Sequence, residues 1–442
     1  MKKVIPISVA VYSVFITLIA NCYPLLHSYP YLWYAAVPIF LAISIFAGIF
    51  GIETKKLRLR ISNHGVILLS VFRISTVLSV IIQTVLAFKY LVSDSSVFWY
   101  GLLVCFIVEF LIFWNGMICV YLASEQLGIK YRVTGLLCGM VPILNIIMLN
   151  RIIKKVRGEV IFETEREQRT LARIKDSVCK TKYPILLVHG VFFRDNKYFN
   201  YWGRIPEDLE LNGARIYYGE HHSAASIADC GEELAEKIKK IINDTGCEKV
   251  NIIAHSKGGL DSRYAIEKCG MAPYIASLTT INTPHRGCIF ADVLLEKISS
   301  DIKDKVANIY NKTFKKLGEE NPDFIAAVSD LTASSCKKLN EQLPTPEGIF
   351  CQSVGSVLKN AKGGTFPLNF SYHLVNFFDG PNDGLVSTDS FEWGEKYTLV
   401  TPTGDRGISH GDMIDLNREN IDGFDVRGFY LDLVSDLKNR GF

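Results

Sequence analysis

The stretch "VNIIAHSKGG", Val250–Gly259, decides the fold of the second half of this 442-residue chain. Its mostly apolar first five residues predict a strand buried on both faces, and the residues from Gly258 onward are predicted to be helical. Ser256 stands at the sharp turn between them, where the backbone can lift a hydroxyl clear of the sheet. Ala254 adds one methyl group where the common G-x-S-x-G pattern has its first glycine. The turn predicts a nucleophilic serine, and a serine that caps the helix is the alternative.

Strand and helix patterns alternate on both sides of this turn. Apolar runs predict strands at 183–188, 214–218 and 275–281. Between the second of these runs and Val250, apolar residues recur at three- and four-residue steps from Ile227 to Ile241, which predicts an amphipathic helix. Such alternation is typical of a parallel sheet wrapped by helices, in which ligands bind at the carboxyl ends of the strands.

Two backbone N–H groups are expected to stabilise an oxyanion beside Ser256. One follows the nucleophile directly, which assigns it to Lys257, and the other comes from the loop after an early strand. Val191 is placed for the second role because it follows the strand end at His189-Gly190. His189 itself is expected to shape this loop rather than to move protons.

The candidate base is a histidine late in the chain, and three histidines follow Ser256. His410, in "GISHGD", comes after a predicted strand at 397–400 in a glycine-rich loop and is the favoured base. His285 directly follows a predicted strand and can be structural. His373 precedes every plausible acid, whereas an acid is expected before the base.

The candidate acid lies in "DGPNDGLVS", which offers Asp379 and Asp383. Asp383 is favoured, because it is followed by a glycine and a short apolar run, a turn that can direct its carboxylate at the histidine. Asp379 is the alternative. Capping a helix or forming a turn is the plainer role for either aspartate.

The first 157 residues have a different composition. Four apolar stretches are long enough to cross a bilayer, which takes roughly 20 residues. A fifth, Val133–Leu149, is shorter and contains Pro142, so we expect a re-entrant or interfacial segment turned at that proline. The four predicted spans are Ile5–Leu26, Leu32–Ile52, Val66–Phe88 and Val97–Tyr121.

The charges of this region predict its orientation. Up to Arg157 there are fourteen Lys and Arg against four acids, about +10, so the rest holds 48 − 14 = 34 bases against 45 − 4 = 41 acids, about −7. With four spans, all bases at the ends of the spans except Lys89 fall on one side, which predicts a multi-pass protein of the cell membrane whose second half faces the cytoplasm. The acidic second half argues against a nucleic-acid partner.

Other polar residues give further expectations about the two halves. The eleven cysteines have no C-x-x-C pairs or regular spacing, which predicts reduced thiols and agrees with a cytoplasmic second half. Within the spans, Arg73 and Glu109 lie at similar depth, so we expect a buried ion pair that fixes helix packing.

The chain is therefore divided into a transmembrane region at 1–157, a charged helical linker at 158–182 and an α/β domain at 183–442. An insertion at 290–343 has little strand character, and its segments "FADVLLEKISSDI" and "FIAAVSDL" are apolar at helical spacing. The sequence predicts helices there, forming either a mobile lid or a fixed cap.

The second half resembles the bacterial triacylglycerol lipases of the α/β-hydrolase fold. Five features in order carry the resemblance: "LVHGVFF" with "YWGRIP" and "ARIYYGE", then "AHSKGG", "INTPHRG", "GPNDGLVS" and "SHGD". The resemblance implies Ser256 as nucleophile, Asp383 as acid, His410 as base, and Val191 and Lys257 as oxyanion donors.

The resemblance also implies a possible calcium site and a departure from the family. Many such lipases bind a structural calcium through an aspartate two positions after the catalytic histidine, which is Asp412 here, and through another aspartate upstream of the catalytic one. No aspartate occurs between Asp330 and Asp379, so no cofactor is predicted to be required. These lipases are typically secreted, and the resemblance does not cover the first 157 residues.

The sequence predicts a membrane-anchored serine lipase or carboxylesterase that hydrolyses acyl esters of lipids at the bilayer. A phospholipase or an acyltransferase of the same fold is the close alternative, since all three share the acyl-enzyme chemistry. The rival from another class is a membrane transport or sensor protein whose hydrolase-like domain only binds a ligand.

Overall fold

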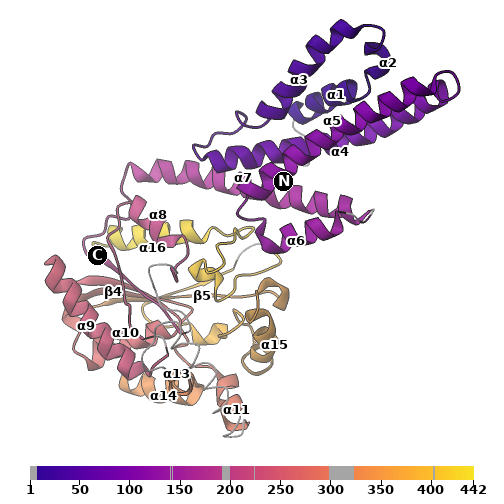
Figure 1. Cartoon of the computed structure of the whole chain (residues 1–442). Helices are drawn as coiled ribbons and strands as arrows, with labels where there is room; N and C mark the ends of the chain where they lie inside the picture. The colour runs from indigo at the N-terminus through magenta and orange to yellow at the C-terminus, as the bar shows by residue number, and fades with distance from the viewer. Residues whose placement is uncertain are drawn as a thin grey trace. The chain divides into compact units, whose positions relative to one another are not determined.

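A computed structural model describes residues 7–139, 141, 143–191, 200–222, 224–297, 323–401 and 404–442 of the chain (Figure 1). The chain divides into two compact units, Met1–Leu171 and Ala172–Phe442. The first unit is helical, and the second contains a six-stranded sheet.

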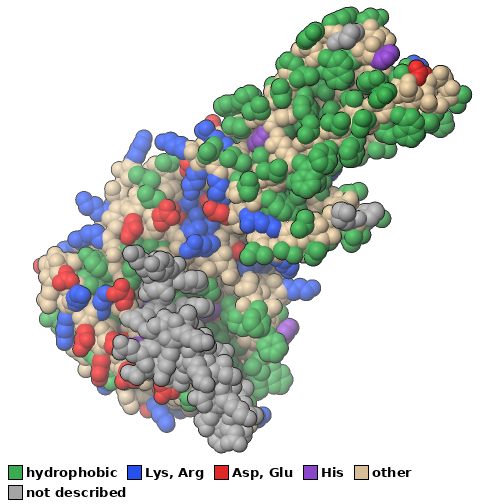
Figure 2. Space-filling model, viewed as in Figure 1, with side chains coloured by type: hydrophobic (Ala, Val, Ile, Leu, Met, Phe, Trp, Pro, Cys, Tyr) green, Lys and Arg blue, Asp and Glu red, His purple; other side chains and the backbone are tan. Residues whose placement is uncertain are grey.

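Two long helices dominate the first unit, α4 (Leu57–Tyr90) and α5 (Ser95–Ala123). Both are long and apolar enough to cross a membrane. They pack closely where two glycines meet, since a Cβ added at Gly65 would lie 2.9 Å from the carbonyl oxygen of Gly116. Hydrophobic side chains cover much of the visible surface of these helices (Figure 2).

The first two predicted spans contain shorter helices. α1 (Ile7–Ala20) and α3 (Trp33–Phe46) are apolar but have 14 residues each, fewer than the roughly 20 that a straight crossing takes. The short helices α2 (Tyr23–Leu26) and η1 (Pro30–Leu32) lie between them.

The fifth apolar stretch is not one helix. α6 (Gly128–Cys138) ends before α7 (Leu144–Ile174) begins, and Ile143 between them has a positive φ of 71°. Pro142, the expected turning point, lies outside the described residues. α7 then continues without a break through position 157, so the predicted boundary between membrane region and linker falls inside a helix.

The expected ion pair between Arg73 and Glu109 is wrong. The Glu109 carboxylate accepts hydrogen bonds from the hydroxyls of three α4 residues, at 2.9, 3.1 and 3.2 Å. Arg73 instead donates to Asn150 at 2.5 Å. Glu109 lies level with the part of α4 that follows Arg73, so the hydroxyls meet the carboxylate first. The three donors are Ser75, Thr76 and Ser79.

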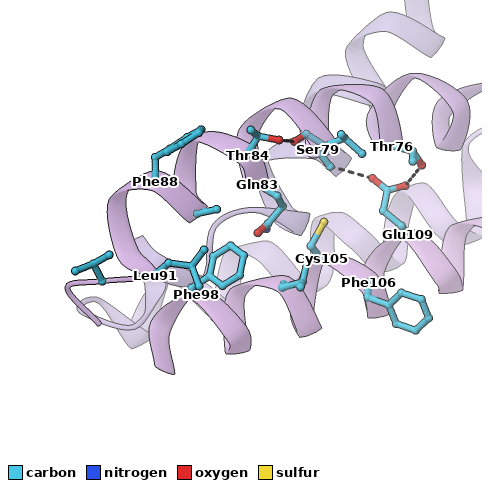
Figure 3. Close-up of a pocket in the computed structure, with 14 residues that line it drawn as sticks. Thr76, Ser79, Gln83, Thr84, Phe88, Leu91, Phe98, Cys105, Phe106 and Glu109 are labelled. Atoms are coloured by element: carbon cyan, nitrogen blue, oxygen red, sulfur yellow. Dashed lines mark hydrogen bonds between the residues drawn. The ribbon is translucent and has the colours of Figure 1, made fainter. Parts of the chain in front are cut away.

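A cavity of about 770 Å³ opens beside this carboxylate, between α4 and α5 (Figure 3). Its lining is mostly apolar, with Glu109 and the hydroxyls of Thr76 and Ser79 along one side and Phe88, Leu91 and Phe98 toward the other end (Figure 3). The Gln83 amide oxygen is buried there without a hydrogen-bond partner among the described residues.

The sheet of the second unit is parallel throughout, in the order β2-β1-β3-β4-β5-β6. This confirms the predicted parallel sheet, and each of the four strands expected between 183 and 281, as well as the strand after Tyr397, is present. The strands are β1 (Ile185–Val188), β2 (Ile216–Tyr218), β3 (Val250–His255), β4 (Ile275–Ile281), β5 (Phe350–Ser356) and β6 (Lys396–Val400).

Helices cover both faces of this sheet (Figure 1). α8 (Ile205–Leu211) and α16 (Val426–Asn439) pack on one face, against side chains such as Leu187 and Ile253. α9 (Ile227–Thr245) and α10 (Lys257–Lys268) pack on the other, against Leu186 and Ile252. Neighbouring residues of one strand point to opposite faces, so both faces are buried, as the unbroken apolar runs predict.

The described part of the insertion at 290–343 is mostly helical. It contains α11 (Ile289–Lys297), α13 (Phe324–Ser329) and α14 (Ala333–Gln342). Residues 298–322, which include the end of "FADVLLEKISSDI", lie outside the described residues. After β5 the chain forms η3 (Ala361–Gly363) and α15 (Leu368–Asp379), a helix that leads directly to the candidate acid.

Candidate active site

The turn at Ser256 has the backbone of a nucleophile-bearing turn. β3 ends at His255, α10 begins at Lys257, and Ser256 between them has φ 55° and ψ −131°, a conformation that is strained for a residue with a side chain. Two close approaches require the glycines that follow. A Cβ at Gly258 would lie 2.3 Å from the His189 carbonyl oxygen, and one at Gly259 would lie 2.2 Å from Thr283 Oγ1.

The backbone of Ser256 is held on both sides, while its hydroxyl does not cap the helix. The Ser256 N–H donates to the Ile281 carbonyl at 2.9 Å, and Thr283 Oγ1 donates to the Ser256 carbonyl at 2.8 Å. No side-chain hydrogen bond from Ser256 caps α10. The helix-capping alternative is therefore wrong. The methyl group of Ala254 is buried in the core between α9, α10 and the sheet, so the extra carbon is accommodated.

Asp383 and His410 are brought together. His410 Nδ1 lies 2.6 Å from Asp383 Oδ2, and both side chains are buried. The same carboxylate accepts the Leu385 and Val386 N–H groups at 2.9 and 2.8 Å and the Asn282 amide at 2.5 Å. These contacts fix the position of the carboxylate, and the contact with Oδ2 holds the imidazole with its Nδ1–H toward the acid.

The other ring nitrogen of His410 is available for chemistry. His410 Nε2 is buried and has no hydrogen-bond partner among the described residues. The ring lies against His255, with 4.5 Å between centroids, and His255 is the residue directly before Ser256. An imidazole held at Nδ1 by an acid, with the Nε2 lone pair unused, can act as a general base.

The alternative acid and bases have other contacts. The Asp379 carboxylate accepts the N–H groups of Ile289 and Phe290 at 2.8 and 2.9 Å, so it caps α11. His285 is buried against Trp393, with 4.8 Å between ring centroids, and burial lowers its pKa well below 6.5. His373 lies exposed on α15. Of the candidate acids and bases, Asp383 and His410 are the two that the described residues show hydrogen-bonded to each other.

The expected oxyanion donors lie on either side of Ser256. Lys257 is the first residue of α10, where backbone N–H groups have no partner within the helix. Gly190, which precedes Val191, packs directly against the serine, since a Cβ there would lie 2.7 Å from Ser256 Cβ. The two backbone segments that carry the candidate donors therefore both lie next to Ser256.

The side chain of Lys257 turns inward and is fully buried. Its Nζ donates to Asp261 Oδ1 at 2.7 Å and to Cys230 Sγ at 3.1 Å. The spacing of His221, Cys230 and Asp261 would suit a metal ion. The ammonium of Lys257 already binds two of the three residues, and burial raises the pKa of the Cys230 thiol to about 12, so the group does not fit a metal.

A hydrogen-bond chain that the sequence did not reveal joins the two loops around Ser256. The Gly190 N–H donates to Tyr201 Oη at 3.1 Å, so the Tyr201 hydroxyl donates onward to His255 Nδ1 at 2.7 Å. His255 Nε2 then carries the proton and donates to the His410 carbonyl at 3.2 Å. Burial lowers the pKa of His255 well below 6.5, in agreement with this neutral tautomer.

Sequence analysis did not predict the roles of three residues of this site, because their contacts join segments that are distant in the sequence. Asn282, which holds Asp383, follows β4 directly, so its place at the carboxyl edge of the sheet was the available signal. His255 precedes the nucleophile and Tyr201 opens "YWGRIP", but nothing in the sequence shows that they meet.

Asp412 does not fit a calcium ion. Arg406 donates to both of its carboxylate oxygens, at 2.7 and 3.1 Å, and the Ser409 N–H donates to one of them at 2.8 Å. Its charge is already neutralised by the guanidinium and its lone pairs are engaged, whereas calcium needs six to eight oxygen ligands. The candidate calcium site at Asp412 is instead a salt bridge that holds the loop of His410.

The parallel sheet and the serine turn at the end of β3 define a serine hydrolase of the α/β-hydrolase fold. A family model described as "Putative serine esterase" matches residues 216–321. A triacylglycerol lipase of Pseudarthrobacter phenanthrenivorans is 34% identical over 57% of this chain and 99% of its own length. A triacylglycerol lipase of Burkholderia plantarii is 34% identical over 57% of this chain and 88% of its own length. The chain belongs to the triacylglycerol lipase family.

Solved structures are also similar to the second unit. The mature lipase BlEst2 of Bacillus licheniformis is 24% identical, covers 57% of this chain and 92% of its own, and superposes with a TM-score of 0.43. Lipase 1 of Pelosinus fermentans is 16% identical over 58% of this chain and 99% of its own, with a TM-score of 0.42.

Proposed function

We propose that the chain is a membrane-anchored serine lipase or carboxylesterase with Ser256, His410 and Asp383 as its catalytic triad. The observation that carries the proposal is the Asp383–His410 hydrogen bond, which leaves His410 Nε2 without a partner among the described residues, beside the serine turn. His410 takes the proton of Ser256 as its Oγ attacks the ester carbonyl, and Asp383 stabilises the imidazolium that forms.

The acyl-enzyme chemistry then proceeds in two halves. The N–H groups of Val191 and Lys257 stabilise the tetrahedral oxyanion, and His410 gives its proton to the leaving alcohol. Water, deprotonated by the same histidine, releases the acid from Ser256. No metal ion takes part in these steps, since the chain's own residues supply the base, the acid and the oxyanion donors.

The membrane anchor is supported by the helical unit. α4 and α5 are long and apolar, and the sequence places two further apolar stretches before them, so we propose four spans with α6 and the start of α7 at the cytoplasmic surface. The clusters of Lys and Arg at the ends of these spans favour a cytoplasmic hydrolase unit.

Lipid esters as the substrates are supported by α15. Four large apolar side chains near and along this helix are exposed, Phe366 (83%), Phe370 (79%), Leu374 (38%) and Phe377 (79%). Phe370, Leu374 and Phe377 are spaced by four and three residues, which puts them on one face of the helix, and Phe366 lies just before its start. Figure 2 shows hydrophobic side chains at this part of the second unit. Such a face suits contact with acyl chains.

The inner side of the same helix contacts the catalytic loops. Ser371 Oγ binds the Gly384 carbonyl, and a Cβ at Gly384 would lie 3.0 Å from Leu368 Cβ. Lipid at the outer face of α15 would therefore lie close to the turn of Asp383. A phospholipase or an acyltransferase would use the same contacts, and lipid mass spectrometry of the products separates these activities from a lipase.

Labelling of the full chain with a fluorophosphonate tests the triad. We expect labelling of the wild type, none of Ser256→Ala, and unchanged labelling of Ser262→Ala, because the Ser262 hydroxyl is bonded to the Gly258 carbonyl on the same helix. Equal labelling of the wild type and Ser256→Ala would overturn the assignment of the nucleophile, and a ligand-binding protein of the sensor type would show no labelling at all.

Protease treatment of inverted vesicles tests the topology. We expect the hydrolase unit to be digested from the cytoplasmic side, while α4 and α5 are protected. A protected hydrolase unit would place it on the opposite side of the membrane and contradict the orientation that the basic residues favour.

A further inference from the structure

The peptide between Gly190 and Val191 is held by its carbonyl oxygen. His189 Nδ1 lies 2.9 Å from the Gly190 oxygen, within hydrogen-bond geometry. A trans peptide is planar, with its C=O and its N–H pointing in opposite directions. The contact therefore turns the Val191 N–H away from the His189 ring, and the orientation of the proposed oxyanion donor depends on this histidine.

The second ring nitrogen of His189 faces another carbonyl. His189 Nε2 lies 3.1 Å from the His221 oxygen. A carbonyl oxygen only accepts hydrogen bonds, so a ring nitrogen facing one must carry a proton, and both nitrogens carry protons only in the imidazolium form. A neutral ring would direct a lone pair at one of the two oxygens.

The surroundings of His189 suit a cation. The ring is fully buried and stacked on His221, with 4.2 Å between centroids and 8° between planes, and Tyr201 lies at 5.8 Å. The nearby charged side chains are Asp261 and Lys257, which bind each other, and His221 Nε2 lies 3.4 Å from Asp261 Oδ2. Burial raises the pKa of Asp261 to about 6, with smaller lowering by Lys257 and by His189. Above that pH the carboxylate supplies a negative charge.

We propose that His189 is a positioning residue that works as a buried imidazolium behind the oxyanion donors. It holds the Gly190–Val191 peptide in the orientation that stabilises the oxyanion, and its charge lies on the side of that peptide opposite the reacting ester. The inference rests on the proposed function, because it assigns the Val191 N–H to the oxyanion. Its electrostatic part acts where negative charge develops, so it stabilises the transition state more than the bound substrate.

The protonation of His189 can be measured without any turnover. We suggest ¹⁵N NMR of the full chain in detergent with labelled histidine, using His189→Asn to assign the resonances. We expect both ring nitrogens of His189 to be protonated at pH 7, in the wild type and in Ser256→Ala alike. One protonated and one bare ring nitrogen would overturn the proposal, and this outcome is independent of whether Ser256 is the nucleophile.

The pH dependence of kcat tests the effect on catalysis, with a soluble p-nitrophenyl ester as substrate. As the pH rises, His189 loses a proton and one of the two carbonyls loses its donor, so we expect kcat of the wild type to fall on the alkaline side. In His189→Asn the amide retains one donor but carries no charge. We expect kcat to be about tenfold lower, less than the about 10²–10³ lost with a whole oxyanion donor, with KM within about twofold and no such alkaline fall.

His222→Asn is the matched control, because His222 directly follows His221, which stacks on His189, but itself pairs with Glu233. We expect it to keep the wild-type kcat and pH profile. An unchanged alkaline fall in His189→Asn, or a rise in KM with kcat preserved, would contradict the positioning role. Equal thermal unfolding of the variants separates these outcomes from a loss of folding.

Discussion

Each unit of this protein buries a carboxylate and satisfies it with several hydrogen bonds, but the donors differ. Asp383, in the hydrolase unit, is held by two backbone N–H groups, an asparagine amide and His410. Glu109, in the helical unit, is held by three hydroxyls of α4. Backbone and amide N–H groups can only donate, whereas a hydroxyl can donate or accept.

The two carboxylates therefore differ in how freely their partners can rearrange. The backbone and amide donors around Asp383 have fixed directions, so they hold its two oxygens in one orientation, with Oδ2 toward His410. The hydroxyls around Glu109 can rotate to suit either a carboxylate or a carboxylic acid. Donors with fixed directions thus surround the carboxylate of the proposed triad, and hydroxyls that can rotate surround the carboxylate between the packed helices α4 and α5.

Asp383→Asn is the change with the largest expected effect. The amide places an N–H where His410 Nδ1 needs an acceptor, or turns its oxygen there and directs its NH₂ group at the donors of the turn. By comparison with the same change in serine proteases we expect kcat to fall by about 10⁴. Steady-state kinetics on a soluble ester measures it. Asp379→Asn is the control and should retain most activity, and a loss of less than tenfold for Asp383→Asn would remove Asp383 from the triad.

Arg406→Met extends the comparison to Asp412, a third buried carboxylate. The Asp412 side chain is 3% exposed and that of Arg406 is 30% exposed. Removing the guanidinium therefore leaves the buried carboxylate without its cationic partner. We expect a loss of about 3 kcal/mol in the free energy of unfolding, the low end of the range for a broken buried pair.

The double variant Arg406→Met with Asp412→Leu should recover part of this loss, because no charge is left without a partner. A chelator should leave the melting temperature of the wild type unchanged. A lower melting temperature after chelation would show that a cation, rather than the salt bridge alone, stabilises this loop.

Acid should destabilise the hydrolase unit through two histidines that are buried in neutral form. Burial lowers the pKa values of His255 and His285 well below 6.5. Below pH 6.5 the unfolded chain binds protons that the folded chain does not, so stability is complete above pH 6.5 and falls as the pH drops toward the folded pKa values.

Each of these histidines contributes about 1.4 kcal/mol per pH unit in that range. Denaturant unfolding between pH 6.5 and 5 measures the slope, and His285→Gln should reduce it by about one such contribution. An unchanged slope in His285→Gln would show that His285 accepts a proton in the folded state.

Glu109→Gln should have the smallest effect. The glutamine side chain has the same shape, and the hydroxyls of Ser75, Thr76 and Ser79 can turn to meet its amide, so we expect less than about 1 kcal/mol in stability. The activity toward a soluble ester should not change. A tenfold loss of activity at an unchanged melting temperature would show that the helical unit takes part in the reaction and would break the comparison.

The sheet could be predicted because its strands are apolar on both faces and separated by clear turns. The helical unit was predicted less well. The predicted ion pair between Arg73 and Glu109 was wrong. It rested on two opposite charges at similar depth, and helical spacing alone does not show that nearby hydroxyls of α4 bind Glu109 instead. The domain boundary at 157 was expected from a change in charge, but α7 continues through it from Leu144 to Ile174, so a change in charge did not mark the end of a helix.

The candidate site followed from chain order and turn chemistry, which put Ser256 at the end of a strand, Asp383 in a turn and His410 in a loop after a strand. The salt bridge between Arg406 and Asp412 was not predicted. The two residues are six positions apart, and only the folded loop brings their side chains together. The roles of Tyr201, His255 and Asn282 depend on contacts between distant segments, and a single sequence does not contain that information.

The cap that Asp379 forms on α11 links three parts of the hydrolase unit mechanically. Asp379 is the last residue of α15, whose exposed face carries Phe370 and Phe377, and its carboxylate holds the first turn of α11. Only three residues separate it from Asp383. A force on α15 at a lipid surface is therefore transmitted along one short segment both to α11 and to the carboxylate that orients His410.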